Sequence, residues 1–266
     1  MGEKLAGPAL DAEYAGLVLP INRVDVEMPW GWLRRGWQDL ARVPQVSLAF
    51  GLLIALLSVV LILGLWQQDW FAYSFPLASG FMFIAPFLGI AFYEISRRLE
   101  MGAPIHFHDI AVAWSKRPGR IFTLGLIMML FQVAWMRIAT LIYALFFGPD
   151  PVQWADFILK IFTTVDGLLF LLAGTATGAA LAVTSFAIGV VSFPLLLDRD
   201  VGTAQAIATS VAATAANWRV LFGWGALIVL FTAAGLVTGC IGLIITMPLI
   251  GHASWHAYRD LVSDAS

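Results

Sequence analysis

The sequence contains little charge. Only 12% of its 266 residues are Asp, Glu, Lys or Arg, whereas 60% are hydrophobic. Soluble domains carry about a quarter charged residues, so this chain has roughly half the charge that a water-exposed surface requires. The composition excludes a soluble globular domain and predicts an all-α fold, a polytopic bundle of transmembrane helices.

Further absences exclude classes of function. The single cysteine, Cys240, excludes an internal disulfide framework and a cysteine-based zinc cluster. A formal net charge of -2 does not suit phosphate binding, so nucleic acid is not expected as a partner. The chain contains no nucleophile constellation and no glycine-rich phosphate loop, which makes an enzyme the least expected class.

Long uncharged stretches indicate the membrane spans. About 20 apolar residues in a helix cross the hydrocarbon core of a bilayer. The expected spans are residues 46–66, 74–95, 120–147, 176–197, 219–238 and 240–257. The last two form one apolar run that a tight turn near Gly239 would divide, and the alternative is a five-span chain that leaves this run undivided.

The basic residues predict the orientation. Thirteen of the 15 Lys and Arg residues lie on one side of the expected membrane, with Lys160 on the other side and Arg137 inside a span. Basic loops are retained in the cytoplasm, so both termini are expected there. The first 45 residues resemble neither a secretory signal nor a transit peptide. We therefore expect a multi-pass protein of the bacterial inner membrane.

An internal repeat supports an even number of spans. Residues 86–97 align without a gap with residues 248–259 and share Pro, Gly, Ala and Arg, and Phe193-Pro194 begins a weaker copy. A polar, helix-compatible stretch precedes each odd-numbered span. The sequence thus predicts three repeated hairpins with interfacial amphipathic helices.

Residues outside the spans divide into an arm, interfacial helices and a tail. We expect residues 1–29 to be a mobile cytoplasmic arm, 30–262 the membrane domain and 263–266 a tail. In residues 30–42 an apolar face with Trp30 and Trp37 opposes a charged face with Asp39, which indicates a helix on the inner leaflet. Nine tryptophans near span ends or on interfacial stretches predict an aromatic belt, namely Trp30, Trp32, Trp37, Trp66, Trp70, Trp114, Trp154, Trp218 and Trp255.

Arg137 and Gln132 are the candidate ligand-binding residues, and no catalytic residue is predicted. A basic residue at bilayer depth costs at least about 2.5 kcal/mol to insert, so Arg137 is a functional candidate. In one interpretation its side chain extends to the outer headgroups and pairs with an aspartate there. In the other, Arg137 and Gln132 bind an anionic ligand or a lipid headgroup between helices.

The four histidines are the candidate metal ligands. His252 and His256 share one face of a helix, and His106 and His108 begin a cytoplasmic helix, so together they could ligate a transition metal or haem iron. Hydrated histidines at a membrane interface are commoner than metal ligands. No metal or other cofactor is therefore predicted, and the metal stays an alternative.

Three segments resemble a known family. Residues 86–102, Asn217-Trp218-Arg219 and residues 248–260 are similar to a bacterial family of polytopic membrane proteins catalogued as domain of unknown function 2189. The resemblance covers residues 20–262 and implies a fold and a location. Some members carry the label cytochrome c oxidase subunit I-like, which implies haem and copper. That oxidase subunit uses six histidines on several spans, whereas this chain has four, all at expected cytoplasmic edges.

Two functions remain. Small-residue contact motifs such as Gly174-x-x-x-Gly178 favour a structural or accessory component of a membrane complex, with lipid, other subunits or a second copy as partners. The repeats and the span prolines favour the alternative, a transporter or a lipid- or anion-binding protein that uses Arg137. A cavity lined by Arg137 and Gln132 would support the alternative, and a filled bundle with an exposed apolar face the accessory role.

Overall fold

The computed structural model describes residues 16–68, 74–148 and 154–263, and their regular elements are helices apart from one isolated β-bridge. The prediction of an all-α fold is confirmed. The helices are α1 (Met28–Arg42), α2 (Pro44–Gln67), α3 (Ser74–Leu88), α4 (Ile90–Glu100), α5 (Phe107–Ala111), the 3-10 helix η2 (Ala113–Ser115), α6 (Pro118–Phe147), α7 (Trp154–Thr163), α8 (Val165–Gly189), α9 (Ser192–Asp198), α10 (Thr203–Ala216), α11 (Trp218–Val237) and α12 (Leu243–Leu261).

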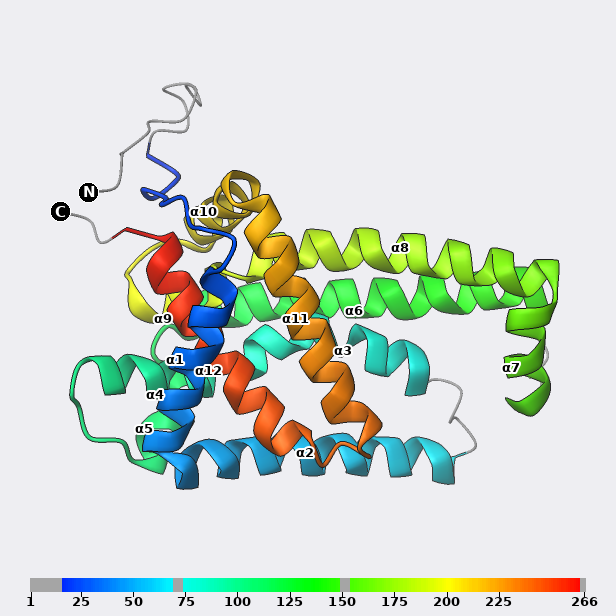
Figure 1. Ribbon diagram of the computed structural model, residues 1–266, viewed down its shortest axis with the longest axis horizontal. Coiled ribbons are helices and arrows are strands. Elements are labelled where there is room, and N and C mark those ends of the chain that lie inside the picture. Colours follow the sequence, from blue (N-terminus) through cyan, green and yellow to red (C-terminus); the bar gives the residue numbers. More distant parts are fainter. Residues whose placement is uncertain (1–15, 69–73, 149–153, 264–266) are drawn as a thin grey trace.

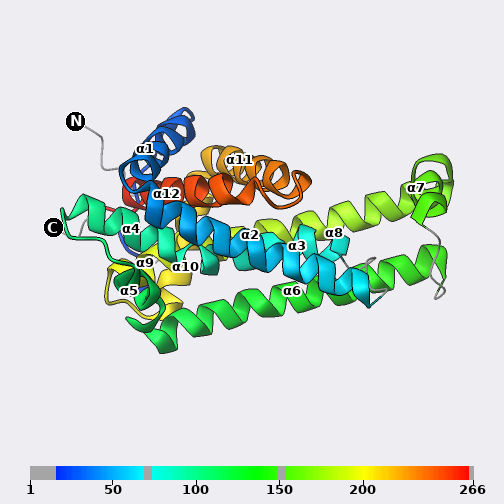
Figure 2. The same ribbon diagram turned by 90° about the horizontal axis from the view of Figure 1, so that it is seen from below.

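Four stretches of the described chain are long and apolar enough to cross a membrane: α2, α6, α8 together with α9, and α11. The longest single helix, α6, has 30 residues and extends about 45 Å at a rise of 1.5 Å per residue. In Figure 1 the axes of α2, α6 and α8 run along the long axis of the molecule, whereas α11 and α12 cross them obliquely. Figure 2 shows that α2 is inclined to α6 and α8 in the other view. The protein is therefore a polytopic helical bundle.

The two ends of the bundle differ in character. The described part of the chain begins and ends at one end, together with α1, α4, α5, α9 and α10, and α7 lies at the opposite end (Figure 1). The ion pairs between described residues connect α1, α4, α5, α9, α12, the first turn of α6 and the segments next to these helices. We call this the polar end. Apolar side chains such as Leu57 and Leu61 of α2, and Leu126 and Leu130 of α6, are exposed between the two ends.

The expected span 74–95 is divided into α3 and α4 at Gly89. The break leaves a carbonyl for another element to satisfy, and the Trp114 indole N–H donates to the Phe87 carbonyl at 3.1 Å. A second break separates α8 from α9. There the Ser210 hydroxyl donates to the Ala187 carbonyl at 2.7 Å and accepts from the Val191 N–H at 3.1 Å. At each break a side chain from another element thus pairs with the backbone inside the protein, as membrane depth requires.

Most of the expected span 240–257 lies in α12, which begins at Leu243 and is continuous through Pro248. The second half of α12 carries His252, His256 and Arg259 and is mostly buried. These polar residues lower the mean hydropathy of α12, so α12 is not among the helices that are apolar enough to cross a membrane. Helices α4 and α12, which contain the two segments aligned above, pack against each other, and Gly251 lies against the Phe92 ring.

Glycines let α1 and α2 approach the backbone of α12. An added Cβ would lie 2.7 Å from the Ala253 nitrogen at Gly36, and 2.4 Å from the Ile244 carbonyl oxygen at Gly51. In the predicted contact motif of α8, Gly178 faces the Trp135 ring of α6, whereas a Cβ added at Gly174 would meet nothing within 4 Å. These close approaches make α12 the central element of the polar end.

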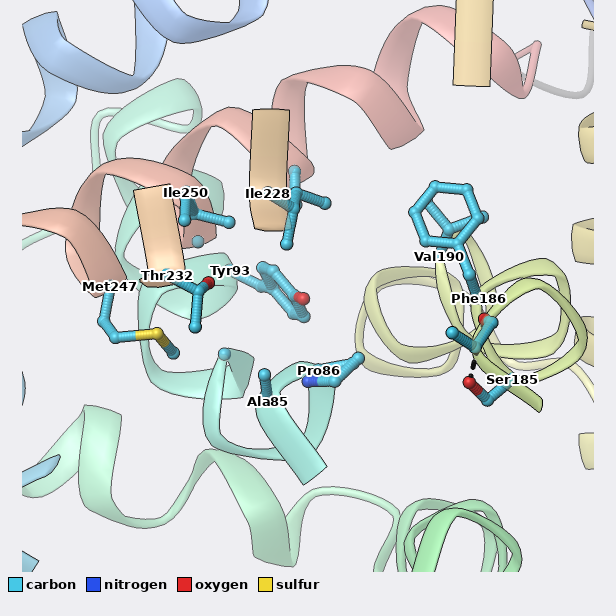
Figure 3. A pocket seen from close by; sticks show the side chains of 14 residues that line it. Ala85, Pro86, Tyr93, Ser185, Phe186, Val190, Ile228, Thr232, Met247 and Ile250 are labelled. Atoms are coloured by element: carbon cyan, nitrogen blue, oxygen red, sulfur yellow. Dashed lines mark hydrogen bonds between the residues drawn. The ribbon is translucent and has the colours of Figure 1, made fainter. Parts of the chain in front are cut away.

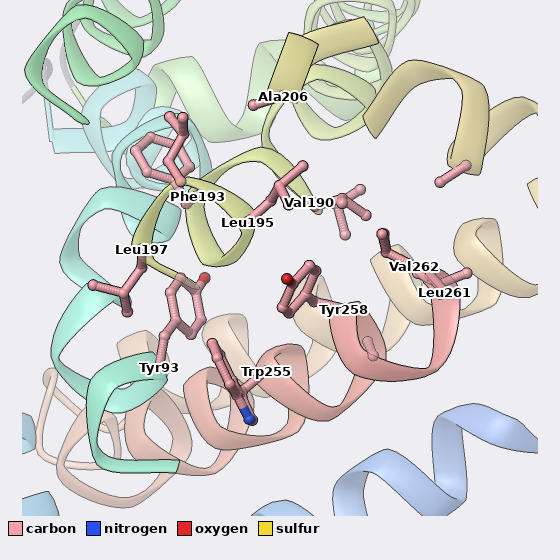
Figure 4. Close-up of a cluster of buried hydrophobic side chains, with 14 of the residues drawn as sticks. Tyr93, Val190, Phe193, Leu195, Leu197, Ala206, Trp255, Tyr258, Leu261 and Val262 are labelled. Carbon is pink, nitrogen blue, oxygen red and sulfur yellow. The ribbon is translucent and has the colours of Figure 1, made fainter. Parts of the chain in front are cut away.

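Large aromatic side chains fill the core of the polar end (Figure 4). Trp32, Trp224, Trp255 and Tyr258 are at most 1% exposed, and the Trp32 and Trp224 rings meet edge to face. The belt prediction is therefore wrong for Trp32 and Trp255, which pack against other helices. Others of the nine are exposed, among them Trp30, Trp37, Trp66 and Trp218. Trp70 lies outside the described residues, as does the side chain of Trp154.

Helix α1 is rotated relative to the expected amphipathic helix. Its buried residues are Pro29, Trp32, Leu33, Gly36, Asp39 and Leu40. Asp39, assigned to the charged face, is buried, and Trp30 and Trp37, assigned to the apolar face, are exposed. The amphipathic pattern predicts a helix whose apolar face lies on the membrane. In the structure, the buried face of α1 packs on α12 instead.

The segment before α1 is held to the polar end. Ile21 pairs with Val262 in the β-bridge, and the Leu19 N–H donates to the Thr209 hydroxyl at 3.1 Å. The Asn217 side-chain oxygen accepts from the Val24 N–H at 3.0 Å. The arm expected over residues 1–29 is thus anchored from Leu19 onward, whereas residues 1–15 lie outside the described residues.

We expect the contact between α2 and α12 to depend on Gly51. Gly51→Val places side-chain atoms against the α12 backbone and should destabilise the fold by about 1–3 kcal/mol. Gly64→Val on the same helix is the matched control, because a Cβ there meets nothing within 4 Å. Thermal unfolding in detergent should show a lower midpoint for the Gly51 variant only, and equal midpoints would contradict the contact.

Candidate functional site

A buried carboxylate on α1 is the centre of a polar network. Asp39 is 4% exposed, and its Oδ2 accepts from the Ser96 hydroxyl of α4 and from His256 Nε2 of α12, both at 2.8 Å. Arg42 lies one turn along α1, 4.0 Å from the other carboxylate oxygen. Three helices therefore meet at one charged group.

The network continues through a second histidine to α2. His252 Nδ1 lies 2.8 Å from the Ser96 hydroxyl oxygen, and His252 Nε2 lies 3.0 Å from the Ser47 hydroxyl oxygen. Ser96 gives its only hydroxyl proton to Asp39, so His252 Nδ1–H must donate to Ser96. His252 Nε2 then accepts from Ser47. The hydrogen bonds thus run in one direction from Ser47 to Asp39. We call the five connected residues the Asp39 network: Asp39, Ser47, Ser96, His252 and His256.

Two opposing effects set the pKa of Asp39. Burial raises this pKa, but the hydrogen bonds from His256 and Ser96 and the charge of His256 lower it. The hydrogen bonds and this charge outweigh burial, so the pKa lies below its ordinary value of 3.8. Asp39 is therefore ionised at neutral pH and holds its donors strongly.

The order Ser47, His252, Ser96, Asp39 is similar to a nucleophile, base and acid relay with an extra hydroxyl in the middle. Ser47 and His252 are both 0% exposed, however. A nucleophile needs contact with a substrate, and here protein atoms surround it. The arrangement fits a structural clamp that joins α1, α2, α4 and α12.

Glu94 of α4 forms a second buried cluster at the polar end. Its carboxylate is 0% exposed and pairs with Arg97 at 3.0 Å, Arg98 at 2.8 Å and Lys116 at 2.6 Å. Arg98 also pairs with Asp109 of α5 at 3.0 Å. The pairing with Arg97 and Arg98 follows from helical spacing. Lys116 is distant in sequence, so only the fold brings it to Glu94.

A small cavity lies where the two broken helices face α11 and α12 (Figure 3). Its volume is about 60 Å³. Pro86, Gly89 and Tyr93 line it from the first break, and Phe186 and Val190 from the second. Neither Arg137 nor Gln132 lines this cavity.

The two predicted ligand-binding residues lie on different faces of α6. Gln132 is 6% exposed and points at Gly80 of α3, where an added Cβ would lie 2.2 Å from the Gln132 Oε1. Neither polar atom of its amide has a hydrogen-bond partner in the described structure. Arg137 is exposed, and no ion pair joins it to a described residue.

The predicted metal ligands separate into two places. His252 and His256 belong to the Asp39 network, where their ring nitrogens already have partners. His106 is exposed and lies 3.2 Å from Asp109, and His108 is also exposed. Among the described residues no group of three or more His, Cys, Asp or Glu could hold a metal ion.

Comparison with known proteins agrees with the membrane architecture. Residues 74–198 match the model of a family described as "Predicted integral membrane protein (DUF2189)". The match runs from α3 through α9 and includes both helix breaks. The resemblance inferred from the sequence is confirmed over these residues, and the protein is an integral membrane protein. Searches of curated proteins and of solved structures gave no match.

Stability at low pH should report on Asp39. Because folding lowers the pKa of Asp39, the carboxylate stabilises the fold above about pH 4, and this contribution disappears as pH falls through the lowered value. Asp39→Asn should destabilise the protein by about 3 kcal/mol at pH 7. Thermal midpoints in detergent between pH 7 and pH 3 should fall less steeply for Asp39→Asn than for wild type.

Ser96→Ala is the control for this measurement. It removes one hydrogen bond to Asp39 but keeps the charge and the His256 contact. It should therefore keep most of the wild-type slope. Parallel slopes for wild type and Asp39→Asn would contradict the role given to the carboxylate.

Proposed function

We propose that this protein crosses the bacterial inner membrane six times, with both termini in the cytoplasm, and is a structural or accessory component of a membrane complex. The proposed orientation is supported by the polar end, where the described chain begins and ends (Figure 1) and where the arginines and the lysine of the ion pairs lie. Basic segments stay in the cytoplasm, so the polar end faces inward and α7 outward. The two additional crossings are α3 with α4, and α12.

The chain path supports six crossings. Each hairpin partner returns to the polar end: α4 after α2, α9 after α6, and the end of α12 after α11 (Figure 1). The segment from α3 to α4 covers residues 74–100, about 40 Å of helix, which is enough to cross the core. Helix α12 has 19 residues, and its polar half is shielded by α1 and α4.

The observation that carries the accessory role is the closed interior of the bundle. The Asp39 network clamps four helices, and the cavity at the helix breaks holds only about 60 Å³. A drug-sized ligand requires a pocket of about 300–1,000 Å³. In contrast, α2 exposes a continuous apolar face with Leu53, Leu57 and Leu61, which lipid or the helix of another subunit would cover.

The alternative, a lipid- or anion-binding protein or transporter that uses Arg137, has one observation in its favour. Arg137 follows Arg120 by 17 residues, about 26 Å along α6, and it is exposed. This separation places its guanidinium near the outer headgroups if Arg120 lies at the inner ones. We therefore assign Arg137 to an outer lipid phosphate and not to a transport path, since Gln132 faces away toward α3.

Cysteine accessibility tests the orientation. With Cys240→Ser as background, a cysteine at Lys160 should react with a membrane-impermeant maleimide in intact cells. A cysteine at Ser263 should react only after permeabilisation, and a cysteine at Arg34 is the cytoplasmic control. Labelling at Ser263 in intact cells would contradict six crossings and favour five.

Native mass spectrometry from mild detergent tests the accessory role. We expect another membrane subunit at a fixed stoichiometry, which is lost when Leu53, Leu57 and Leu61 are changed together to Ala. The matched control changes three exposed apolar residues of α6 to Ala, namely Leu126, Leu130 and Val133. If the wild-type protein and the α6 control are both monomers that carry only lipid, the accessory role is contradicted.

The Arg137→Gln variant should lose bound phospholipid in the same measurement, whereas Lys160→Gln should keep it.

A further inference from the structure

The cavity between the broken helices contains polar groups that the described protein leaves without partners. Tyr93 of α4, Thr232 of α11 and Ser254 of α12 line it and are 5%, 4% and 6% exposed. No hydrogen bond joins any of their hydroxyls to another described residue. Figure 3 shows the Tyr93 hydroxyl pointing into the space between α11, α12 and α8.

Buried hydroxyls of this kind require a partner. A buried donor or acceptor without a hydrogen bond costs about 1–3 kcal/mol, and the hydrocarbon around this bundle supplies none. At the two breaks, the Phe87 carbonyl already accepts a hydrogen bond from Trp114, and the Ala187 carbonyl accepts one from Ser210. At this cavity, three hydroxyls from three helices converge on one space without a protein partner.

We propose that this cavity is a binding site for water, and for uncharged hydrogen-bonding molecules of similar size. A water molecule needs at least about 10–15 Å³ of accessible space and two to four polar partners. The cavity has about 60 Å³ and three free hydroxyls, so it has room for a few waters. Ser185 also lines it and can accept a further bond, because its proton goes to the Ala182 carbonyl.

The lining also determines what the site excludes. No charged side chain is among the lining residues, so an ion would be desolvated without compensation. The remaining walls are apolar, including Met247, Ile228 and Ile250. A cavity lined only by such side chains stays dry, and the hydroxyls make the difference. The helix breaks thus enclose a hydrated site at membrane depth.

Radiolytic hydroxyl-radical labelling of the whole protein in lipid nanodiscs tests this site, since water bound beside a buried side chain generates radicals that modify it. Met247, which lines the cavity at 3% exposure, should be modified several-fold faster than Met128 of α6, at 1%. Tyr93 should be modified faster than the buried Tyr258 of the polar end. Equal rates within each pair would overturn the proposal.

Variants connect the labelling to the hydroxyls. Combining Tyr93→Phe, Thr232→Val and Ser254→Ala should make the cavity dry and reduce Met247 modification to the level of Met128. Thr184→Val is the matched control, because the Thr184 hydroxyl bonds to Ala180 on the exposed side of α8. Where the triple variant does not fold, Ala85→Leu, which fills the cavity, should give the same reduction. Unchanged Met247 modification in these variants would also overturn the proposal.

Discussion

The ionised Asp39 carboxylate is buried where α1 lies across α12, and the polar end depends on it. A carboxylate in such a place is tolerated only when donors surround it, so the helices that supply them must stay in position. Ser96 of α4 and His256 of α12 donate directly, and His252 connects Ser47 of α2 to the same group. One charge therefore helps to set the relative positions of four helices.

The bilayer imposes the same requirement on the rest of the bundle. Helix breaks inside the membrane expose backbone carbonyls that lipid cannot satisfy. The Phe87 carbonyl accepts a hydrogen bond from Trp114, and the Ala187 carbonyl accepts one from Ser210. At the cavity between these breaks the described protein supplies no partner for three hydroxyls. This contrast points to bound water there. A hydrated pocket of this size fits a rigid bundle better than a transport path, since it holds waters and not a substrate.

Much of the fold could be predicted because its signals are local. Apolar length identifies α2, α6 and α11, and helical spacing pairs Glu94 with Arg97 and Arg98. The site could be predicted only in part. His252 and His256 were singled out as an i, i+4 pair, but Asp39 was assigned to a solvated face because its residue type favours water. Only contact with α12 reveals that its partners compensate for burial.

By itself, the sequence determined that the chain lies in lipid and that its fold is all-helical. Scarce charge and long apolar runs leave a helical bundle in a membrane as the stable solution, because lipid cannot satisfy the backbone of any open structure. The tertiary structure decided which polar residues are buried together, where the helices break, and that Gln132 and Arg137 face different neighbours. These properties depend on contacts between residues far apart in the sequence, such as Asp39 and His256, which are 217 positions apart, and no local pattern encodes such contacts.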